Sequence, residues 1–157
     1  MKIRLLLNGK TKPETVAQIL KTYEGRINKY IAFETVIIPD LKNTKGLSPD
    51  IIKRKEAELI KKNLSDKEHV ILLDEKGKEQ TSTEFADSLQ NHFSYSSKPV
   101  CFVVGGAYGF DNEIYSIANQ KLALAKMTFS HQIIRILFAE QLYRALTIIH
   151  GDPYHND

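Results

Sequence analysis

The feature that most restricts the fold of this chain is an apolar run at residues 100–104 (VCFVV), followed directly by Gly105, Gly106 and, three residues later, Gly109. A short apolar run without charge is typical of a strand buried on both faces, as in the middle of a parallel sheet. Ligands of open α/β sheets bind where strands end at their carboxyl side, and glycine lets the backbone approach a ligand closely. The sequence therefore predicts a small-molecule pocket at residues 105–109.

Strand patterns alternate with helix patterns along the whole chain. The predicted strands cover residues 3–7, 33–38, 69–73 and 100–104 with a weak fifth at 122–125, and the predicted helices cover 13–27, 49–63, 81–93, 111–119 and 132–149. Residues 74–78 (DEKGK) are predicted to turn the chain. Alternation of this kind is typical of an α/β domain with a mostly parallel sheet flanked by helices. We expect a single domain over residues 1–157, because no linker or internal repeat divides the chain.

Composition narrows the class of protein without identifying it. The net charge of +3 permits a polyanionic partner such as RNA but does not require one. The single cysteine, Cys101, lies inside the apolar run, so no disulfide can form within the chain. No apolar stretch approaches the length of a membrane span, and the N-terminal apolar run is too short for a signal peptide. These features favour a cytoplasmic protein.

Several common sites are excluded by their motifs. The Gly9-Lys10-Thr11 segment resembles the end of a phosphate-binding loop, but Arg4 stands where that motif needs glycine. The glycines at 105–109 do not form G-x-G-x-x-G, no serine lies in G-x-S-x-G, and the histidines lack the spacing of metal ligands. What remains is a pocket of glycines and small apolar residues. Such a pocket suits a flat, neutral-to-cationic cofactor such as S-adenosylmethionine.

Four segments near the C-terminus carry a more specific signal. They are residues 103–110 (VVGGAYGF), 124–131 (LAKMTFSH), 140–145 (EQLYRA) and 153–155 (PYH). In this order and spacing the chain closely resembles the RlmH family of SPOUT-class methyltransferases, whose pattern includes GG-x-x-G, L-S-x-M-T-x-x-H, E-Q-x-Y-R-A and a terminal P-Y-H. The resemblance covers the whole chain, including the N-terminal strand that ends at Asn8 and the strand end at Asp74 before Gly77 and Lys78.

The resemblance implies a definite activity. The family transfers a methyl group from S-adenosylmethionine to N3 of a pseudouridine in the helix 69 loop of 23S ribosomal RNA, within assembled ribosomes. It also implies a SPOUT fold whose C-terminal segment forms a trefoil knot, and a homodimer in which the catalytic surface is shared between subunits. Two alternatives stay open: a SPOUT enzyme that modifies another RNA, and a ribosome-associated RNA-binding protein without catalysis.

Site residues follow from the motif segments. The resemblance places cofactor contacts on Leu73, Gly105, Leu124, Ala125, Lys126, Met127, Thr128 and Phe129. The candidates for handling the N3 proton or its anion are His131, Arg144, Tyr154 and His155. For Arg144 the competing interpretation is an ion pair with Glu140 one helical turn back, and for His131 it is a helix-start residue without chemistry.

One departure from the family pattern lies at the C-terminus. Family tails commonly place Arg or Lys after Pro-Tyr-His, whereas this chain has Asn156 and Asp157. If that cation contacts RNA phosphate, other basic residues must replace it. The candidates are Lys42, Lys45, Lys53 and Arg54.

Overall fold

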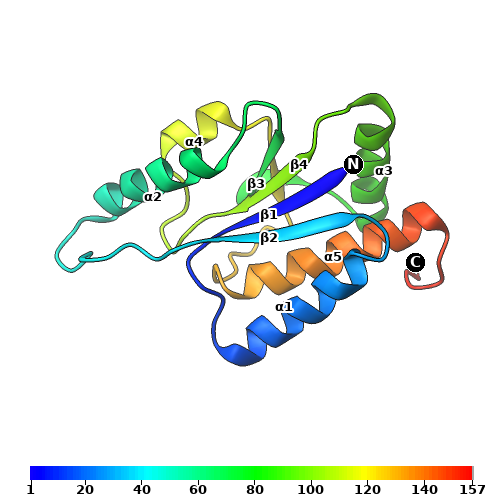
Figure 1. Cartoon of the computed structure of the whole chain (residues 1–157), viewed down its shortest axis with the longest axis horizontal. Coiled ribbons are helices and arrows are strands. Elements are labelled where there is room, and N and C mark those ends of the chain that lie inside the picture. Colours follow the sequence, from blue (N-terminus) through cyan, green and yellow to red (C-terminus); the bar gives the residue numbers. More distant parts are fainter. Residues whose placement is uncertain (157) are drawn as a thin grey trace.

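The apolar run at residues 100–104 forms β4 (Val100–Val104), the central strand of a five-stranded sheet, and all five of its residues are buried. In the computed structural model, which describes residues 1–156, the strands are ordered β2-β1-β4-β3-β5 and every pair is parallel (Figure 1). The other strands are β1 (Lys2–Asn8), β2 (Ala32–Ile38), β3 (His69–Glu79) and β5 (Gln120–Ala123). The predicted parallel α/β sheet is confirmed.

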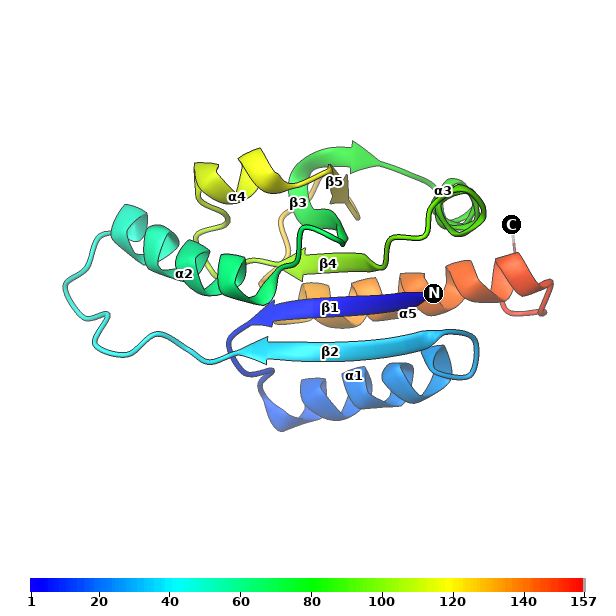
Figure 2. The same cartoon turned by 45° about the horizontal axis from the view of Figure 1, so that its top comes forward.

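Helices cover both faces of this sheet. One face packs against α1 (Glu14–Ile27), α3 (Ser82–Tyr95) and α5 (Ile133–His150), and the other against α2 (Pro49–Asn63) and α4 (Asn112–Ile117) (Figures 1 and 2). Successive side chains of β4 point to opposite faces of the sheet, so this strand contributes to the hydrophobic core on each face. Phe102 packs on Phe138 of α5 at 4.6 Å between ring centroids, whereas Val103 belongs to the core beneath α2 and α4.

Helix ends follow the capping signals of the sequence. Ser48 accepts a hydrogen bond from the Ile51 N–H at 3.3 Å, and Pro49 occupies the first turn of α2. Thr81 and Glu84 form a complete capping box at the start of α3. Gly151 ends α5 with φ of 73°, a left-handed conformation that glycine adopts without strain. Within residues 1–156, no helix combines the length and apolar character needed to cross a membrane.

The structure differs from the sequence prediction after Leu73. Residues 74–78 do not simply turn the chain, because β3 continues to Glu79 and passes across β5, so that both Leu73 and Lys78 pair with Leu122. The polar composition of this part hides a strand that is largely exposed to solvent. Gly77 makes the crossing possible. A Cβ at Gly77 would lie 2.6 Å from the Lys121 carbonyl carbon and 2.7 Å from the Leu122 nitrogen.

Replacing Gly77 with alanine is expected to lower the free energy of unfolding by about 1–3 kcal/mol, because the added methyl group meets backbone that cannot rotate away. Urea unfolding followed by circular dichroism measures the change. Gly25→Ala is the matched control, since a Cβ at Gly25 of α1 meets nothing within 4 Å and alanine favours a helix. Equal stability of the Gly77 variant and the wild-type chain would contradict the close crossing.

Candidate functional site

A cavity of about 710 Å³ lies at the carboxyl ends of β3, β4 and β5, where the sequence predicted a pocket. Its walls come from three segments: residues 73–76 of β3, residues 104–110 at the end of β4 and beyond it, and residues 124–131 after β5. The register of the sheet brings the first two together, because Leu73 pairs directly with Val104. Carboxyl ends of neighbouring parallel strands meet at one edge of the sheet, which is where open α/β folds bind ligands.

The predicted cofactor contacts gather around this cavity. All of them except Lys126 line it, and Lys126 is an exposed residue beside it. His131 also lines the cavity, two residues before α5 begins. Of the four basic residues considered for RNA contact, Lys53 lines the cavity as well and lies 3.4 Å from the carboxylate of Asp50.

Gly105, Gly106 and Gly109 line one side of the cavity, and the first two pack closely on neighbouring residues. A Cβ at Gly105 would lie 3.2 Å from the ring of Phe110, and a Cβ at Gly106 would lie 2.6 Å from both carboxylate oxygens of Glu56. Gly109 has φ of 79°, and its N–H donates to the Gly106 carbonyl at 3.1 Å to close the turn. A side chain at either of the first two positions would fill space that the loop and its neighbours now occupy.

The lining of the cavity combines apolar side chains with charged groups of both signs, because Lys53 and Lys76 line it together with Asp74 and Glu75. Two carboxylates, Asp74 and Glu75, lie at the rim and accept hydrogen bonds from the hydroxyls of Tyr115 and Thr128 respectively. Burial, together with the bond to Asp74, raises the pKa of Tyr115 and keeps it a donor. The apolar part of the lining includes Leu73, Val104, Phe110, Leu122, Leu124 and Ile134. Apolar walls with both carboxylates and lysines suit a ligand that combines a flat body with positive and negative groups.

A buried arginine that the sequence analysis did not single out supports the back of this site. Arg135 is fully buried, and its Nη1 donates to the Gly9 carbonyl and to the Thr11 hydroxyl, each at 2.8 Å. Its Nη2 donates to the Asn8 carbonyl at 2.9 Å, and its Nε donates to the His131 carbonyl at 2.9 Å. Burial lowers the pKa of Arg135 to about 10. The guanidinium thus joins the end of β1 to the segment that carries His131.

Glu56 was also missed by sequence analysis. Its side chain extends from α2 to the back of Gly106, and burial raises the pKa of its carboxyl group. Among the described residues, its Oε2 and the Asn8 Nδ2 are two of the three buried side-chain atoms without a hydrogen-bond partner, the third being Thr35 Oγ1. The sequence signal for Arg135 was a lone charge within an apolar helical run. Glu56 stood in a helix rich in charges, a pattern that indicated either a solvated face or contact with nucleic-acid phosphates.

The remaining predicted residues form a second cluster near the end of α5. Arg144 Nη2 lies 2.5 Å from Glu140 Oε1, so the predicted ion pair is present. Arg144 Nη1 also donates to His155 Nδ1 at 3.2 Å, and the guanidinium carbon lies 4.8 Å from the centroid of the Tyr154 ring. The Tyr154 hydroxyl donates to Glu140 Oε1 at 3.2 Å. Burial, with Tyr23 and Glu140 nearby, raises the pKa of Tyr154 to about 12.

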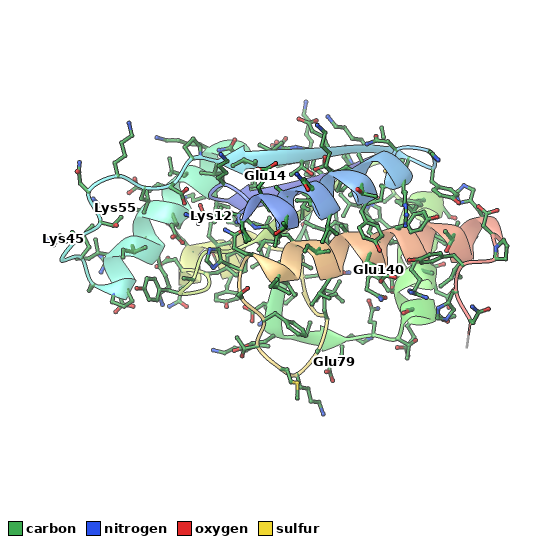
Figure 3. All side chains as sticks on the ribbon, turned by 90° about the horizontal axis from the view of Figure 1, so that it is seen from below. Lys12, Glu14, Lys45, Lys55, Glu79 and Glu140 are labelled. Carbon is green, nitrogen blue, oxygen red and sulfur yellow. The ribbon has the colours of Figure 1, made fainter. Side chains whose placement is uncertain are left out.

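Within one chain, this tail cluster and the cavity are separate. Ile134 lines the cavity and Arg144 contacts the tail ten positions further along α5, which corresponds to about 15 Å of helix. Figure 3 shows Glu140 well along α5 from the end where Lys12 lies, and the Lys12 N–H bonds to Gln132 just before that helix. The structure therefore brings His131 to the cavity and leaves Arg144, Tyr154 and His155 together elsewhere. Asn156 is exposed, and Asp157 lies outside the described residues.

Comparisons with known proteins agree with this geometry. A family model described as predicted SPOUT methyltransferase matches residues 1–155. A protein of Bacteroides thetaiotaomicron called ribosomal RNA large subunit methyltransferase H is 46% identical, with all of both chains covered, and one of the same name from Parabacteroides distasonis is 47% identical over the same extent. A crystal structure of a probable methyltransferase from Bordetella pertussis has a similar fold, with a TM-score of 0.54, 12% identity and 92% and 93% of the two chains covered.

Proposed function

This chain belongs to the SPOUT methyltransferase family, and we propose that it methylates large-subunit ribosomal RNA with S-adenosylmethionine as the methyl donor. The observation that carries the proposal is the pair of relatives named for this activity, each aligned over the full length of both chains. The cavity at residues 105–109 and 124–131 supports it, because those loops carry the motif segments and converge at one edge of the sheet.

The residues present fit S-adenosylmethionine. The cavity of about 710 Å³ falls within the range of small-molecule sites. Its apolar walls suit the flat adenine and the methionine chain, and the carboxylates of Asp74 and Glu75 suit a sulfonium cation. The glycines let the loop after β4 pack closely on Phe110 and Glu56, so that backbone groups of residues 105–109 line the cavity. Leu73, Gly105 and the segment 124–129 would hold the cofactor.

We infer that the target atom is N3 of a pseudouridine in the helix 69 loop of 23S ribosomal RNA, in the assembled ribosome. When bound, S-adenosylmethionine would supply the methyl group: a bond from N3 to the methyl carbon would form as the bond from that carbon to sulfur breaks, which would leave S-adenosylhomocysteine, and the N3 proton would pass to a base. Positioning of the two reactants accounts for a large part of such a rate. The residues of this chain that bear on the N3 proton or anion are His131, Arg144, Tyr154 and His155.

Their electrostatics suit those roles. Burial, with the Arg135 charge nearby, lowers the pKa of His131, so its ring is neutral near pH 7 and can accept a proton. The bond to Glu140 raises the pKa of Arg144, which keeps a permanent positive charge for an imide anion. Tyr154 stays protonated at neutral pH and donates a hydrogen bond.

The separation of His131 from the tail supports a homodimer in which the tail of one subunit completes the site of the other. We also propose that the whole of residues 1–157 forms one SPOUT domain with a C-terminal trefoil knot, and the close crossing of β3 over β5 at Gly77 is consistent with such a path. A ribosomal substrate places the enzyme in the cytoplasm.

The function is tested with purified protein and S-adenosylmethionine carrying a labelled methyl group. We expect calorimetry to show cofactor binding, and we expect label to enter 70S ribosomes but not free uridine. Mass spectrometry of ribosomal RNA from a deletion strain should lack N3-methylpseudouridine. If that nucleotide persists, the chain methylates another RNA. If the protein does not bind the cofactor, the alternative of an RNA-binding protein without catalysis is favoured.

Mixed dimers test the shared site separately. One subunit carries Gly105→Val, aimed at the cofactor wall, and the other carries Tyr154→Phe with His155→Ala, aimed at the tail. Each homodimer should lose methylation, because every site has one defective half. The heterodimer should recover up to about half of the wild-type rate, because one of its two sites combines an intact wall with an intact tail. Absence of any recovery in a folded heterodimer would show that each chain uses its own tail.

A further inference from the structure

A second cavity lies beside the first and the last residues of β3, whereas the cofactor site is lined by residues 73–76 in the middle of that strand. It has a volume of about 480 Å³ and is bounded by α3, by the starts of β3 and β4, by β5 and by the part of β3 that crosses β5. Its lining consists of His69, Ile71, Lys78, Gln80, Phe85, Ser88, Leu89, His92, Val100, Gln120, Lys121 and Leu122. Neither the relatives' names nor the predicted motifs account for this cavity.

The floor of the second cavity is apolar and rigid. Phe85 and Leu89 of α3 and Ile71 of β3 are all buried in the main core. Phe85 packs edge-on against Phe102, with ring centroids 6.1 Å apart. A flat ligand would therefore meet a surface that does not need to reorganise on binding.

Two histidines and two amides stand around that floor. The rings of His69 and His92 lie 4.8 Å apart, and His92 Nε2 is held by the Lys98 carbonyl at 2.8 Å. Gln80 Nε2 donates to the Ser88 hydroxyl at 2.7 Å, and Gln120 lines the same cavity. Imidazole faces stack on planar heterocycles, and amide groups pair with the donors and acceptors at the edge of a base.

The charge of the lining has one sign. Lys78 and Lys121 belong to the cavity, and no Asp or Glu among residues 1–156 lines it. The Lys121 ammonium group lies 5.3 Å from the centroid of the Tyr115 ring, on the side toward the first cavity, so Lys78 is the cation that faces a ligand of the second cavity. The combination of an apolar floor, amide groups and a lysine in the lining matches a base attached to a phosphate.

We propose that the second cavity binds an unpaired nucleotide of the RNA substrate, with its base on the floor and its phosphate toward Lys78. The proposal rests on the proposed function, since it takes RNA to be the substrate. An unpaired nucleotide is the form in which proteins read RNA loops, because a base out of the stack exposes its faces and its edges.

The placement of the two cavities favours the substrate RNA over a free nucleotide. Leu122 lines both cavities, and the short segment from Gln120 to Leu124 leads from one to the other. Four residues of extended chain span about 13 Å. A single RNA loop can therefore present its target base at the first cavity and a neighbouring nucleotide at the second.

Paired substitutions on α3 test this site in the full-length enzyme. Ser88→Glu places a carboxylate in the lining, and Ser94→Glu places the same charge on the same helix outside it, where the native hydroxyl bonds only to the Gln90 carbonyl. We expect Ser88→Glu to raise the KM for ribosomes at least tenfold, with kcat and the cofactor Kd within twofold of wild type. Ser94→Glu should change neither. Equal effects of the two variants would overturn the proposal, since net charge alone would then explain them.

A direct titration separates this proposal from the proposed function. Uridine 5′-monophosphate, added to the wild-type protein, should shift the imidazole NMR signals of His69 and His92, and Ser88→Glu should weaken that response. Uridine and inorganic phosphate are the comparison probes. The same shifts with phosphate alone would show an anion site without base recognition, and no shifts with the nucleotide would show that the cavity does not bind it. Either result overturns the proposal even where methylation of ribosomes is observed. If methylation fails while the nucleotide binds, the proposed function is wrong and the cavity remains a nucleotide site.

Discussion

Replacing Arg135 with alanine is expected to lower the free energy of unfolding by about 3–5 kcal/mol, the largest effect on stability that the structure indicates. The guanidinium is fully buried and satisfies the carbonyl groups of Asn8, Gly9 and His131. Truncation leaves these buried acceptors unpaired, and each costs about 1–3 kcal/mol when it finds no replacement. Urea unfolding monitored by circular dichroism gives the change directly.

Two further substitutions serve as controls for the Arg135→Ala variant. Arg54→Ala removes an exposed arginine from α2 and should change stability by no more than about 0.5 kcal/mol. Arg135→Lys keeps the charge but loses the planar fork that reaches several acceptors at once, so its stability should lie between those of the alanine variant and wild type. A stability loss below about 1 kcal/mol for Arg135→Ala would mean that water or neighbouring groups satisfy the carbonyls, and that Arg135 does not hold β1 to the start of α5.

Most of the fold could be predicted because local sequence and tertiary structure agree. The helix at residues 49–63 was predicted with the bounds that α2 has, since Ser48 and Pro49 mark its start and its apolar positions recur at helical spacing. The extension of β3 beyond Leu73 could not be predicted. Residues 74–79 are mostly polar, and only the backbone of β5, far along the chain, gives them a pairing partner. Gly77 is needed there for a contact that no local pattern reveals.

The site could be located from its motifs but not assembled from them. Motif segments placed the loops after β4 and β5 at one cavity, apart from Lys126. The hydrogen bond from Arg135 to Gly9 links residues 126 positions apart. The close approach of Glu56 to Gly106 brings a side chain of α2 against the loop after β4. Such contacts depend on the packed fold. The distance between His131 and the tail cluster likewise follows only from the length and direction of α5.

Replacing Gly105 with valine is expected to weaken binding of S-adenosylmethionine at least 100-fold, about 2.7 kcal/mol, as measured by isothermal titration calorimetry. A Cβ at Gly105 would already lie 3.2 Å from the Phe110 ring and 3.4 Å from the Gly109 carbonyl oxygen. The two methyl groups of valine must then extend either into the core or into the cavity that Gly105 lines. Because Phe110 is itself buried, the cavity is the direction with free space.

The control for this result carries the same side chain elsewhere. Gly25→Val adds valine on α1, where a Cβ meets nothing within 4 Å, and should leave the cofactor Kd unchanged. Gly105→Ala adds one methyl group and should give an intermediate loss of affinity. Overpacking also destabilises a core by about 1–3 kcal/mol, so the binding measurement is made at a temperature where thermal unfolding shows each variant to be folded. Wild-type affinity in a folded Gly105→Val variant would mean that the cofactor does not contact this wall, and the binding site would have to lie nearer to the segment 124–129.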